Sequence, residues 1–315
     1  MNGADCGAQC AAAAAAAVGP PGFESWMRER LALFEAAADR ALPPADRTPS
    51  RLHQAMRYAA LGGGKRIRPL LAYAAAELGG DGGAPSPGAH CVALAVEFVH
   101  VYSLIHDDLP CMDDDVLRRG KPTVHVAFDE ATAMLAGDAL QAEAFRVLAD
   151  APLPAGLCVR LVATLAHAAS TEGMCGGQAI DLAAVGRQLT LPELELMHRM
   201  KTGALLAAAV RMGAAAGNAD EQATAAADAY AAALGLAFQI VDDVLDVEGT
   251  AESLGKTAGK DALGNKPTYV SVLGLDAAKA RAAQLHRDAL AALAPLGDRA
   301  RRLRELADLI VGRSH

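Results

Sequence analysis

Aromatic residues are scarce in this chain of 315 residues: they make up 4% of it, with a single tryptophan. Alanine is instead the commonest residue, and it has the highest intrinsic helix propensity of the amino acids. The sequence also lacks convincing segments of alternating apolar and polar residues, which are typical of half-buried strands. The composition therefore favours an all-α protein whose helices pack closely together.

Excess positive charge and paired cysteines are lacking as well. The formal net charge is -8, which argues against a nucleic-acid-binding surface because such surfaces need clustered Lys and Arg. An acidic protein can still bind acidic substrates if divalent cations bridge the like charges. The six cysteines form no CxxC pair and a chain of this size needs no disulfides, so we interpret them as free thiols in a reducing cytosol.

No stretch of about 18 uncharged apolar residues is present, so the sequence predicts no membrane span and a cytoplasmic location. The first residues contain seven consecutive alanines and lack both the basic flank of a signal peptide and the Arg-rich pattern of a transit peptide. We predict that residues 1–22 form a disordered tail. From Phe23 onward, helical segments follow one another without an evident linker, which predicts one helical domain over residues 23–315.

An acidic cluster follows an apolar run in the first half of the chain. Five aspartates lie within nine positions, from Asp107 to Asp115. Carboxylates at the C-terminal end of a helix oppose the helix dipole, so the alternative of a plain solvated helix end is a poor one and a bound cation is favoured. Asp107 and Asp113 would not share a face of a regular helix, because six residues advance by about 600°. Pro110 interrupts the helix and allows Asp113 to return towards Asp107.

A second acidic pair, Asp242 and Asp246, lies inside another apolar segment. The two residues are i and i+4, so their carboxylates lie on one helix face, about 6 Å apart at Cβ, and repel each other by a few tenths of a kcal/mol. A bound hard cation reverses that sign, and oxygen ligands suit Mg²⁺. Two such clusters on facing helices predict a cavity with several Mg²⁺ ions between them.

Basic residues follow a glycine-rich turn and both acidic clusters. Lys65 comes directly after three glycines at 62–64, where the backbone can approach a ligand closely, and Arg68 lies three residues further on. The spacing is not that of a P-loop, and such a run on its own is more often an ordinary basic loop. The other cations are Arg118, Arg119, Lys121, Lys201, Lys256, Lys260 and Lys266. They either neutralise nearby aspartates or hold a diphosphate leaving group together with Mg²⁺.

Six segments, in order, resemble the motifs of the trans-isoprenyl diphosphate synthases, and most closely those of bacterial farnesyl diphosphate synthases. The segments are GGGKRIRP, DDLPCMDDDVLRRGKPTVH, GMCGGQAIDL, KTG, FQIVDDVLDV and GKTAGKD, and they extend from residue 62 to about residue 267. The resemblance implies a single-domain helical bundle around a central cavity, a homodimer, and head-to-tail condensation of isopentenyl diphosphate with dimethylallyl and geranyl diphosphates.

The resemblance also assigns roles to individual residues. The predicted Mg²⁺ ligands, for three ions per active site, are Asp107, Asp108, Asp113, Asp242 and Asp246. The predicted site for isopentenyl diphosphate comprises Lys65, Arg68, His100 and Arg119. The predicted site for the allylic diphosphate comprises Arg118, Lys201, Thr202, Gln239 and Lys256. The Lys201 carbonyl and the Thr202 and Gln239 side chains are also expected to stabilise the allylic cation.

The implied mechanism needs no protein nucleophile. Loss of the allylic diphosphate gives an allylic cation, the double bond of isopentenyl diphosphate attacks it, and the departed diphosphate takes the proton that leaves. The sequence accordingly has no Ser/His/Asp arrangement, no dinucleotide fingerprint and no zinc-type Cys/His spacing that would indicate other chemistry.

Product length depends on the residues that precede Asp107, because the growing chain is expected to extend along that helix. Tyr102 and Ser103 lie five and four positions before Asp107 and form the predicted floor of the pocket. Tyr102, together with the insertion of Pro110 and Cys111, resembles the bacterial type that forms (E,E)-farnesyl diphosphate (C15). The alternative is geranylgeranyl diphosphate (C20), whose plant-type synthases share the insertion but usually carry a smaller or more flexible residue at this position.

Three further alternatives agree less well with the motifs. A terpene cyclase has a different second metal motif, and a non-catalytic regulatory subunit of a prenyl synthase usually loses aspartates, whereas both motifs are whole here. A structural helical protein would not carry six motifs in order. One departure is the chain end, His315, where similar synthases often have a basic residue; a neutral histidine there is expected to weaken any contact with phosphate.

Overall fold

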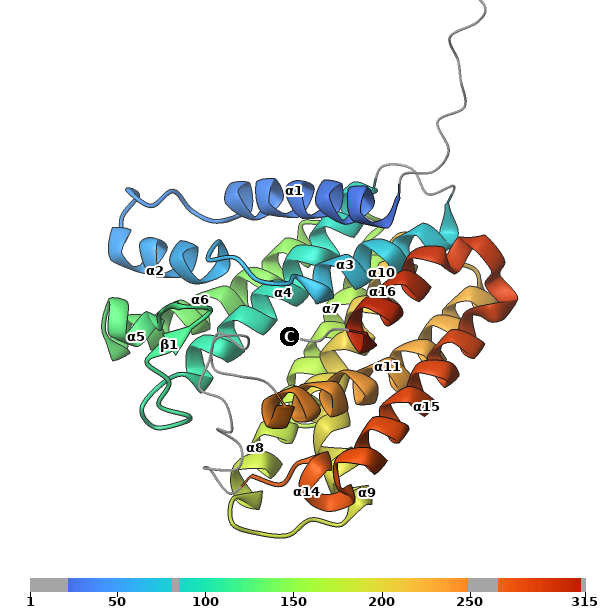
Figure 1. Ribbon diagram of the computed structural model, residues 1–315. Coiled ribbons are helices and arrows are strands. Elements are labelled where there is room, and N and C mark those ends of the chain that lie inside the picture. Colours follow the sequence, from blue (N-terminus) through green and yellow to red (C-terminus); the bar gives the residue numbers. More distant parts are fainter. Residues whose placement is uncertain (1–21, 81–84, 249–265, 313–315) are drawn as a thin grey trace, which may run out of the picture.

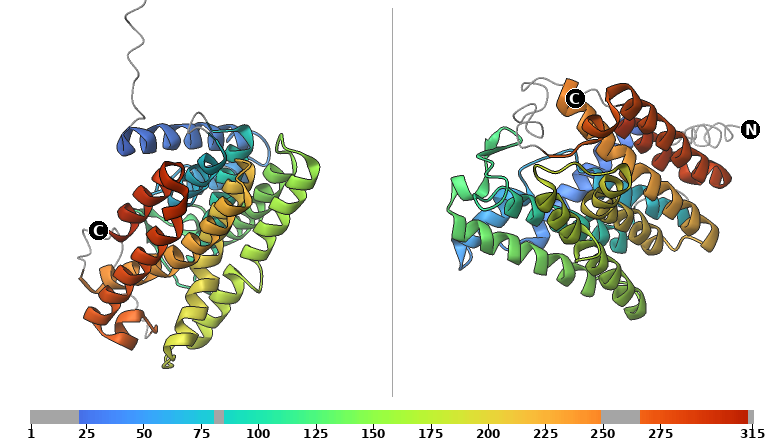
Figure 2. Two further views of the ribbon diagram at one scale, coloured as in Figure 1. Left: turned by 90° about the vertical axis from the view of Figure 1, so that its right-hand side faces the viewer. Right: turned by 90° about the horizontal axis from the view of Figure 1, so that it is seen from below.

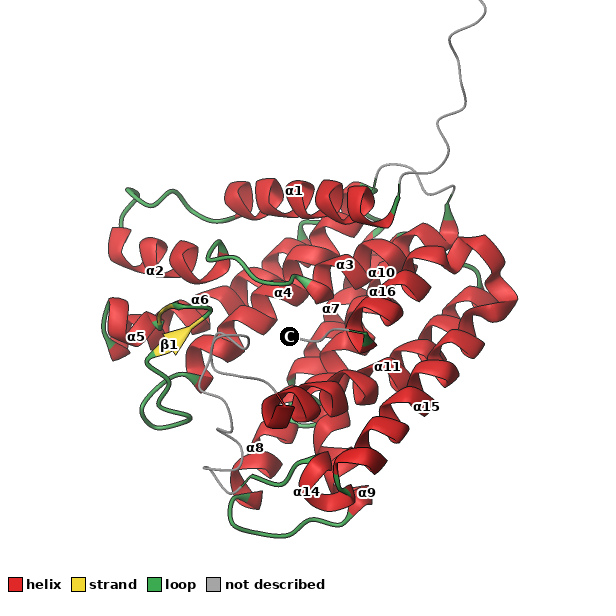
Figure 3. Cartoon of the chain, in the orientation of Figure 1, coloured by secondary structure: helices red, strands yellow, loops and turns green. Residues whose placement is uncertain are grey.

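The computed structural model describes residues 22–80, 85–248 and 266–312. Most of this part of the chain is helical (Figure 1, Figure 3), which confirms the all-α prediction. The helices are α1 (Phe23–Ala41), α2 (Ser50–Ala60), α3 (Ile67–Ala76), η1 (Glu77–Gly79), α4 (Pro87–Asp107), α5 (Val124–Ala127), α6 (Glu130–Ala149), α7 (Ala155–Ala169), α8 (Met174–Ala184), α9 (Leu191–His198), η2 (Arg199–Gly203), α10 (Ala204–Ala216), α11 (Glu221–Glu248), α14 (Tyr269–Leu273), α15 (Leu275–Leu293), η3 (Ala294–Ala300) and α16 (Arg301–Val311).

The first helix lies across one end of the bundle (Figure 1). It begins at Phe23, where the sequence predicts that the helical segments start, and it ends at Ala41, before the two prolines at 43 and 44. The predicted tail falls on residues that, except for Gly22, lie outside the described part of the chain. Lys256, Lys260 and His315 also lie outside it.

The core is built from long apolar helices and many small side chains. α4 packs against α3, α6 and α10, while α11 packs against α10 and α15. The helices α15 and α16 lie together at one edge of the bundle (Figure 2). Ala72 of α3, Ala95 of α4 and Ala209 of α10 are fully buried. Because an alanine projects little beyond the backbone, helices that meet at such residues can approach closely, as the composition predicts.

Two core helices carry the acidic clusters towards the cavity. α4 begins at Pro87 and ends at Asp107. The Ser86 side chain caps its first turn by accepting a hydrogen bond from the Ala89 amide at 3.1 Å.

By length and composition, α4 and α11 are apolar enough to cross a membrane, but 72% and 50% of their most apolar windows are buried in the protein. Their apolar character is therefore explained by packing against other helices of the bundle.

A short hairpin follows the first acidic cluster. In it, β1 (Leu117–Arg118) pairs antiparallel with β2 (Lys121–Pro122). The two turn residues, Arg119 and Gly120, both have positive φ angles, of 54° and 74°, as tight two-residue hairpin turns often require. Strands of two residues are too short to show alternation in the sequence. The hairpin places Arg118 and Arg119 beside the central cavity.

Candidate active site

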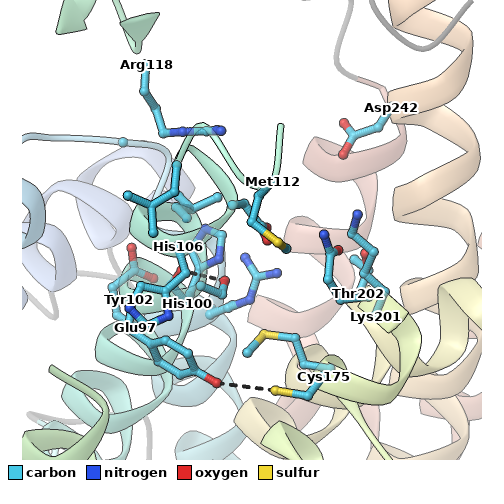
Figure 4. A pocket seen from close by; sticks show the side chains of 18 of the residues that line it. Glu97, His100, Tyr102, His106, Met112, Arg118, Cys175, Lys201, Thr202 and Asp242 are labelled. Carbon is cyan, nitrogen blue, oxygen red and sulfur yellow. Dashed lines mark hydrogen bonds between the residues drawn. The ribbon is translucent and has the colours of Figure 1, made fainter. Parts of the chain in front are cut away.

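A cavity of about 790 Å³ lies between the C-terminal half of α4, the turn before α3, the hairpin, α8, η2 and α11. Most of the predicted site residues line it: Lys65, Arg68, His100, Tyr102, Ser103, Asp107, Arg118, Arg119, Lys201, Thr202, Gln239 and Asp242. Asp108, Asp113 and Asp246 are not among the lining residues. Arg118 and Asp242 lie towards one end of the cavity, whereas Tyr102 and Cys175 lie towards the other (Figure 4).

The chain after α4 turns back on itself. The Asp113 amide donates a hydrogen bond to the Asp107 carbonyl at 2.8 Å, so the two aspartates are brought together as the position of Pro110 predicts. Burial raises the pKa of Asp107 to about 6; the charge of Lys201 opposes this shift and the charge of Asp113 adds to it. The Asp107 carboxylate is therefore placed where a nearby cation would stabilise it.

The two neighbouring aspartates are already paired with cations. Asp108 is 3% exposed and accepts hydrogen bonds from Arg118 Nε at 2.8 and 2.9 Å, so it faces the hairpin rather than the cavity. Asp113 accepts a hydrogen bond from Lys266 Nζ at 2.9 Å. Lys266 lies just before α14, so this pair ties the turn after α4 to that segment.

On α11, a chain of hydrogen bonds fixes the orientation of Gln239. Thr202 Oγ1 donates to Gln239 Oε1 at 3.0 Å, and Gln239 Nε2 donates to Asp243 Oδ1 at 2.9 Å. Asp243 is buried and also accepts from the Tyr269 amide at 2.8 Å. Sequence reasoning missed Asp243 as an orienting residue, although its i+4 spacing from Gln239 is the signal that could have identified it. Asp246, one turn further on, is buried.

Lys201 and Thr202 lie in η2, a π-helical turn between α9 and α10. Such turns interrupt the regular helix and are frequent at functional sites. Lys201 Nζ donates to Asp181 Oδ2 of α8 at 2.5 Å, and Lys266 Nζ lies 4.0 Å from the same oxygen. Asp181 is 5% exposed and was also missed, although it belongs to the quoted GMCGGQAIDL motif. It holds Lys201 at the cavity wall.

Gln178, in the same motif, lines the cavity. Its amide nitrogen and oxygen are both buried, and neither has a hydrogen-bond partner within the described part of the chain. Because buried polar atoms are normally satisfied, this amide is placed to bind a ligand or a water molecule in the cavity.

The basic wall depends on a buried arginine between Lys65 and Arg68. Arg66 is 3% exposed, donates to Glu97 at 2.9 Å and to Glu35 at 3.0 Å, and has a positive φ of 48°. Two carboxylates anchor Arg66, and Lys65 and Arg68 line the cavity beside it. Nothing in the local sequence distinguishes Arg66 from the other cations of the run.

Several cationic groups meet at this wall. Burial lowers the pKa of Arg68, with the charges of Glu97 and Asp242 opposing the shift. Burial, together with the charges of Arg68 and Arg119, lowers the pKa of His100 well below its usual range, so His100 is neutral near pH 7.

Arg119 reaches the glycine-rich turn from the hairpin. Its Nη1 donates to the Gly63 carbonyl. Gly64 has a φ of 133°, which residues other than glycine rarely adopt, and a Cβ there would lie 2.5 Å from the Arg119 guanidinium carbon.

The floor of the cavity is formed by uncharged groups. Tyr102 is 6% exposed, and its hydroxyl lies 3.8 Å from Cys175 Sγ of α8, within hydrogen-bonding distance for sulfur (Figure 4). The Tyr102 ring also packs edge-on against the His106 ring, with 5.8 Å between their centroids. Ser103 donates to the His100 carbonyl at 2.8 Å, so its hydroxyl is satisfied by its own helix.

The carboxylates suit Mg²⁺ only in combination with a ligand. Within residues 22–80, 85–248 and 266–312, no three His, Cys, Asp or Glu side chains are grouped closely enough to hold a metal ion. Mg²⁺ is usually bound by one or two carboxylates together with substrate phosphates and water, rather than by a cage of protein ligands. Asp107 of α4 and Asp242 of α11, with cations lining the same cavity, are a donor set of that kind.

A sequence profile described as polyprenyl synthetase matches residues 49–295. A relative in Bradyrhizobium diazoefficiens, "Probable farnesyl diphosphate synthase", is 50% identical over 287 residues, covering 90% of this chain and 86% of the relative. A relative in Arabidopsis thaliana, "Heterodimeric geranylgeranyl pyrophosphate synthase large subunit 1, chloroplastic", is 45% identical over 275 residues, covering 85% and 72%.

A solved structure shares the fold as well. The crystal structure of geranyltransferase from Helicobacter pylori, complexed with magnesium and isoprenyl diphosphate, superposes with a TM-score of 0.80 at 33% identity. The match covers 93% of this chain and 97% of that one.

Proposed function

The chain belongs to the polyprenyl synthetase family, and from that premise we propose that it is a Mg²⁺-dependent trans-prenyltransferase that makes (E,E)-farnesyl diphosphate. It condenses isopentenyl diphosphate head to tail with dimethylallyl diphosphate and then with geranyl diphosphate. The observation that carries the proposal is one cavity with carboxylates and cations at one end and the Tyr102 floor at the other. The polar end suits two diphosphates, and the floor limits an apolar tail.

In this proposal, the two substrates occupy different walls. Isopentenyl diphosphate binds Lys65, Arg68, His100 and Arg119, and the neutral His100 donates a hydrogen bond to phosphate without adding charge to the arginines around it. The allylic diphosphate binds Arg118 and Lys201, with Lys256 from outside the described residues. Asp107, Asp113 and Asp242, supported by Asp108 and Asp246, would hold three Mg²⁺ ions. When bound, Mg²⁺ supplies a Lewis acid that neutralises charge on the leaving diphosphate.

The protein's own part in the reaction is to place dipoles and exclude water. The Lys201 carbonyl, Thr202 Oγ1 and Gln239 Oε1 are proposed to face the allylic cation, and the hydrogen bonds from Thr202 to Gln239 and from Gln239 to Asp243 hold them in place beforehand. Dipoles fixed before the charge appears stabilise it without reorganisation. The departed diphosphate takes the proton, so no protein base is required.

The Tyr102 floor favours the C15 product over C20. Tyr102 is buried and bridged to Cys175, so its ring occupies the space into which a longer tail would grow. The relationship to a geranylgeranyl synthase keeps C20 as the second candidate. A non-catalytic regulatory role is disfavoured because both acidic motifs retain their aspartates and the basic residues of the site are present.

We also propose a cytoplasmic homodimer. Met134 of α6 and Leu182 of α8 line the cavity and are 42% and 43% exposed, so a single chain leaves apolar side chains of this wall open to water. A second copy packed over α6 and α8 would cover them. Light scattering of the purified full chain at micromolar concentration tests this: a dimer mass supports the proposal and a monomer mass opposes it.

Incubation of the purified full chain with Mg²⁺, isopentenyl diphosphate and either dimethylallyl or geranyl diphosphate tests the proposed function. We expect a dominant C15 product by mass spectrometry and none when EDTA removes the metal. A dominant C20 product would retain the enzyme class but contradict the floor. No product with either allylic substrate would favour the non-catalytic subunit.

A further inference from the structure

The floor of the cavity has two sides, contributed by helices far apart in sequence. Tyr102 projects from α4, and its hydroxyl meets the Cys175 thiol at 3.8 Å across the end of the cavity (Figure 4). Cys175 is exposed and lines the same cavity. The tyrosine therefore closes the cavity only in combination with the first turn of α8.

The first turn of α8 is held firmly against the reaction centre. A Cβ at Gly177 would lie 2.1 Å from the Lys201 amide nitrogen, so the α8 backbone lies directly against η2 at this point. Lys201 is further tied to α8 through Asp181 at 2.5 Å. Because Cys175 is only two residues before Gly177, it is held at a fixed place relative to Lys201 and cannot easily withdraw when a longer product presses on it.

We propose that Cys175 is a specificity-determining residue that sets product length jointly with Tyr102. The inference rests on the proposed prenyltransferase function and deepens it, because it assigns the second half of the floor. The volume of the side chain at position 175 limits how far the apolar tail of the product can extend along α8. The Tyr102 side chain limits its extension along α4 in the same way. A methylene-sized change in an apolar pocket discriminates between ligands by about 10- to 200-fold.

The test enlarges this side chain and reads the product spectrum. Cys175→Leu and Cys175→Phe are incubated with Mg²⁺, isopentenyl diphosphate and dimethylallyl diphosphate, and the C10, C15 and C20 products are quantified. We expect the C10:C15 ratio to rise by at least about tenfold, and further for Phe than for Leu. Ala280→Leu, at an exposed position on α15 that neither lines the cavity nor lies on the proposed dimer face, is the control and should keep the wild-type spectrum.

A smaller substitution keeps the test decisive if the bulky variants do not fold. Cys175→Ala in a Tyr102→Ala background should raise the fraction of C20 and longer products above that of Tyr102→Ala alone. An unchanged spectrum in the folded Cys175 variants would overturn the inference, even while the wild-type protein makes C15. Failure of the wild-type protein to make any product would instead overturn the proposed function, so the two failures are distinguishable.

Discussion

The two ends of the cavity differ in the state of their side chains. At the polar end, burial raises the pKa of Asp107 to about 6 and lowers the pKa values of Arg68 and His100. The charged forms of these side chains are therefore destabilised when no ligand is bound. At the floor, Tyr102 and Cys175 simply contact each other. The difference indicates that the polar end is arranged for charges that arrive with metal and diphosphates, whereas the floor acts through its shape. Polar-end substitutions should therefore change rate and stability, and floor substitutions should change product length.

The largest effect is expected at Asp107. Replacing it with asparagine removes a predicted metal ligand, and the turnover rate should fall by about 10³-fold, as when a main electrostatic contact to the developing charge is lost. Steady-state assays at saturating Mg²⁺ measure this. Asp46→Asn, the same chemical change at an exposed loop position, should leave the rate within threefold or so, which is about 0.7 kcal/mol.

The same Asp107→Asn protein should be more stable than the wild-type protein in the absence of ligands. The Asp107 pKa is raised on folding, so between pH 3.8 and about 6 the unfolded chain loses its proton first and folding stability falls as pH rises. Asparagine does not ionise, so the free energy of unfolding of the variant at pH 7 should exceed that of the wild-type protein by about 2–3 kcal/mol. Urea denaturation at pH 4 and pH 7 measures it. A variant that is inactive but no more stable than wild type would mean that Asp107 is not strained.

Asp181→Asn should have the next largest effect. Without the carboxylate that holds it, Lys201 can leave the cavity wall, and kcat/KM for the allylic diphosphate should fall by about 10- to 100-fold, the value of a hydrogen bond between charged groups. The KM for isopentenyl diphosphate should change little. Asp181→Glu should restore part of the loss. Equal losses for both substrates would indicate a general structural defect instead.

Tyr102→Ala should change the length of the product more than the rate of the reaction. Removing the ring opens the floor along α4, so the main product should shift from C15 to C20 while total isopentenyl transfer stays within about tenfold of wild type. Tyr102→Phe keeps the ring and should keep C15 as the main product. A C15 product from Tyr102→Ala would place the length limit elsewhere.

The smallest effect concerns a histidine just behind the polar end. His198 stacks on Tyr269, and burial lowers the His198 pKa to about 4. The unfolded chain therefore takes up a proton below about pH 6.5 while the folded protein does not, so stability is lost as pH falls. At pH 5.5 the loss should be about 1 kcal/mol relative to pH 7.5. In urea denaturation, His198→Phe should not lose stability between pH 7.5 and pH 5.5. His167 is exposed, so His167→Phe should lose as much stability as the wild-type protein does.

The sequence predicts the helical fold and most of the polar end because motifs there combine unusual residue types in close succession. Asp107 and Asp242 are brought to one cavity by helices whose apolar faces leave few ways to pack, and the turns that carry Lys65 and Arg119 lie at the same cavity. The supporting residues could not be predicted in the same way. Asp181 is recognisable only once η2 lies against α8 and Lys201 reaches it.

Two other features depend on geometry that has no local sequence signal. Arg66 is separated from its neighbours by its backbone conformation and by two carboxylates from other helices. Cys175 belongs to the floor only because Gly177 allows α8 to approach the Lys201 backbone. In both cases the tertiary contact decides the role, and residue type alone does not.

The division between the two ends is tested most directly by one assay on three proteins: wild type, Asp107→Asn and Tyr102→Ala. The initial rate and the product length are measured together with Mg²⁺, isopentenyl diphosphate and dimethylallyl diphosphate. We predict fast C15 formation by wild type, almost no product from Asp107→Asn, and near-normal rates with a C20 product from Tyr102→Ala. A Tyr102→Ala protein that loses its rate but keeps its C15 product, or an Asp107→Asn protein that keeps its rate, would contradict the account.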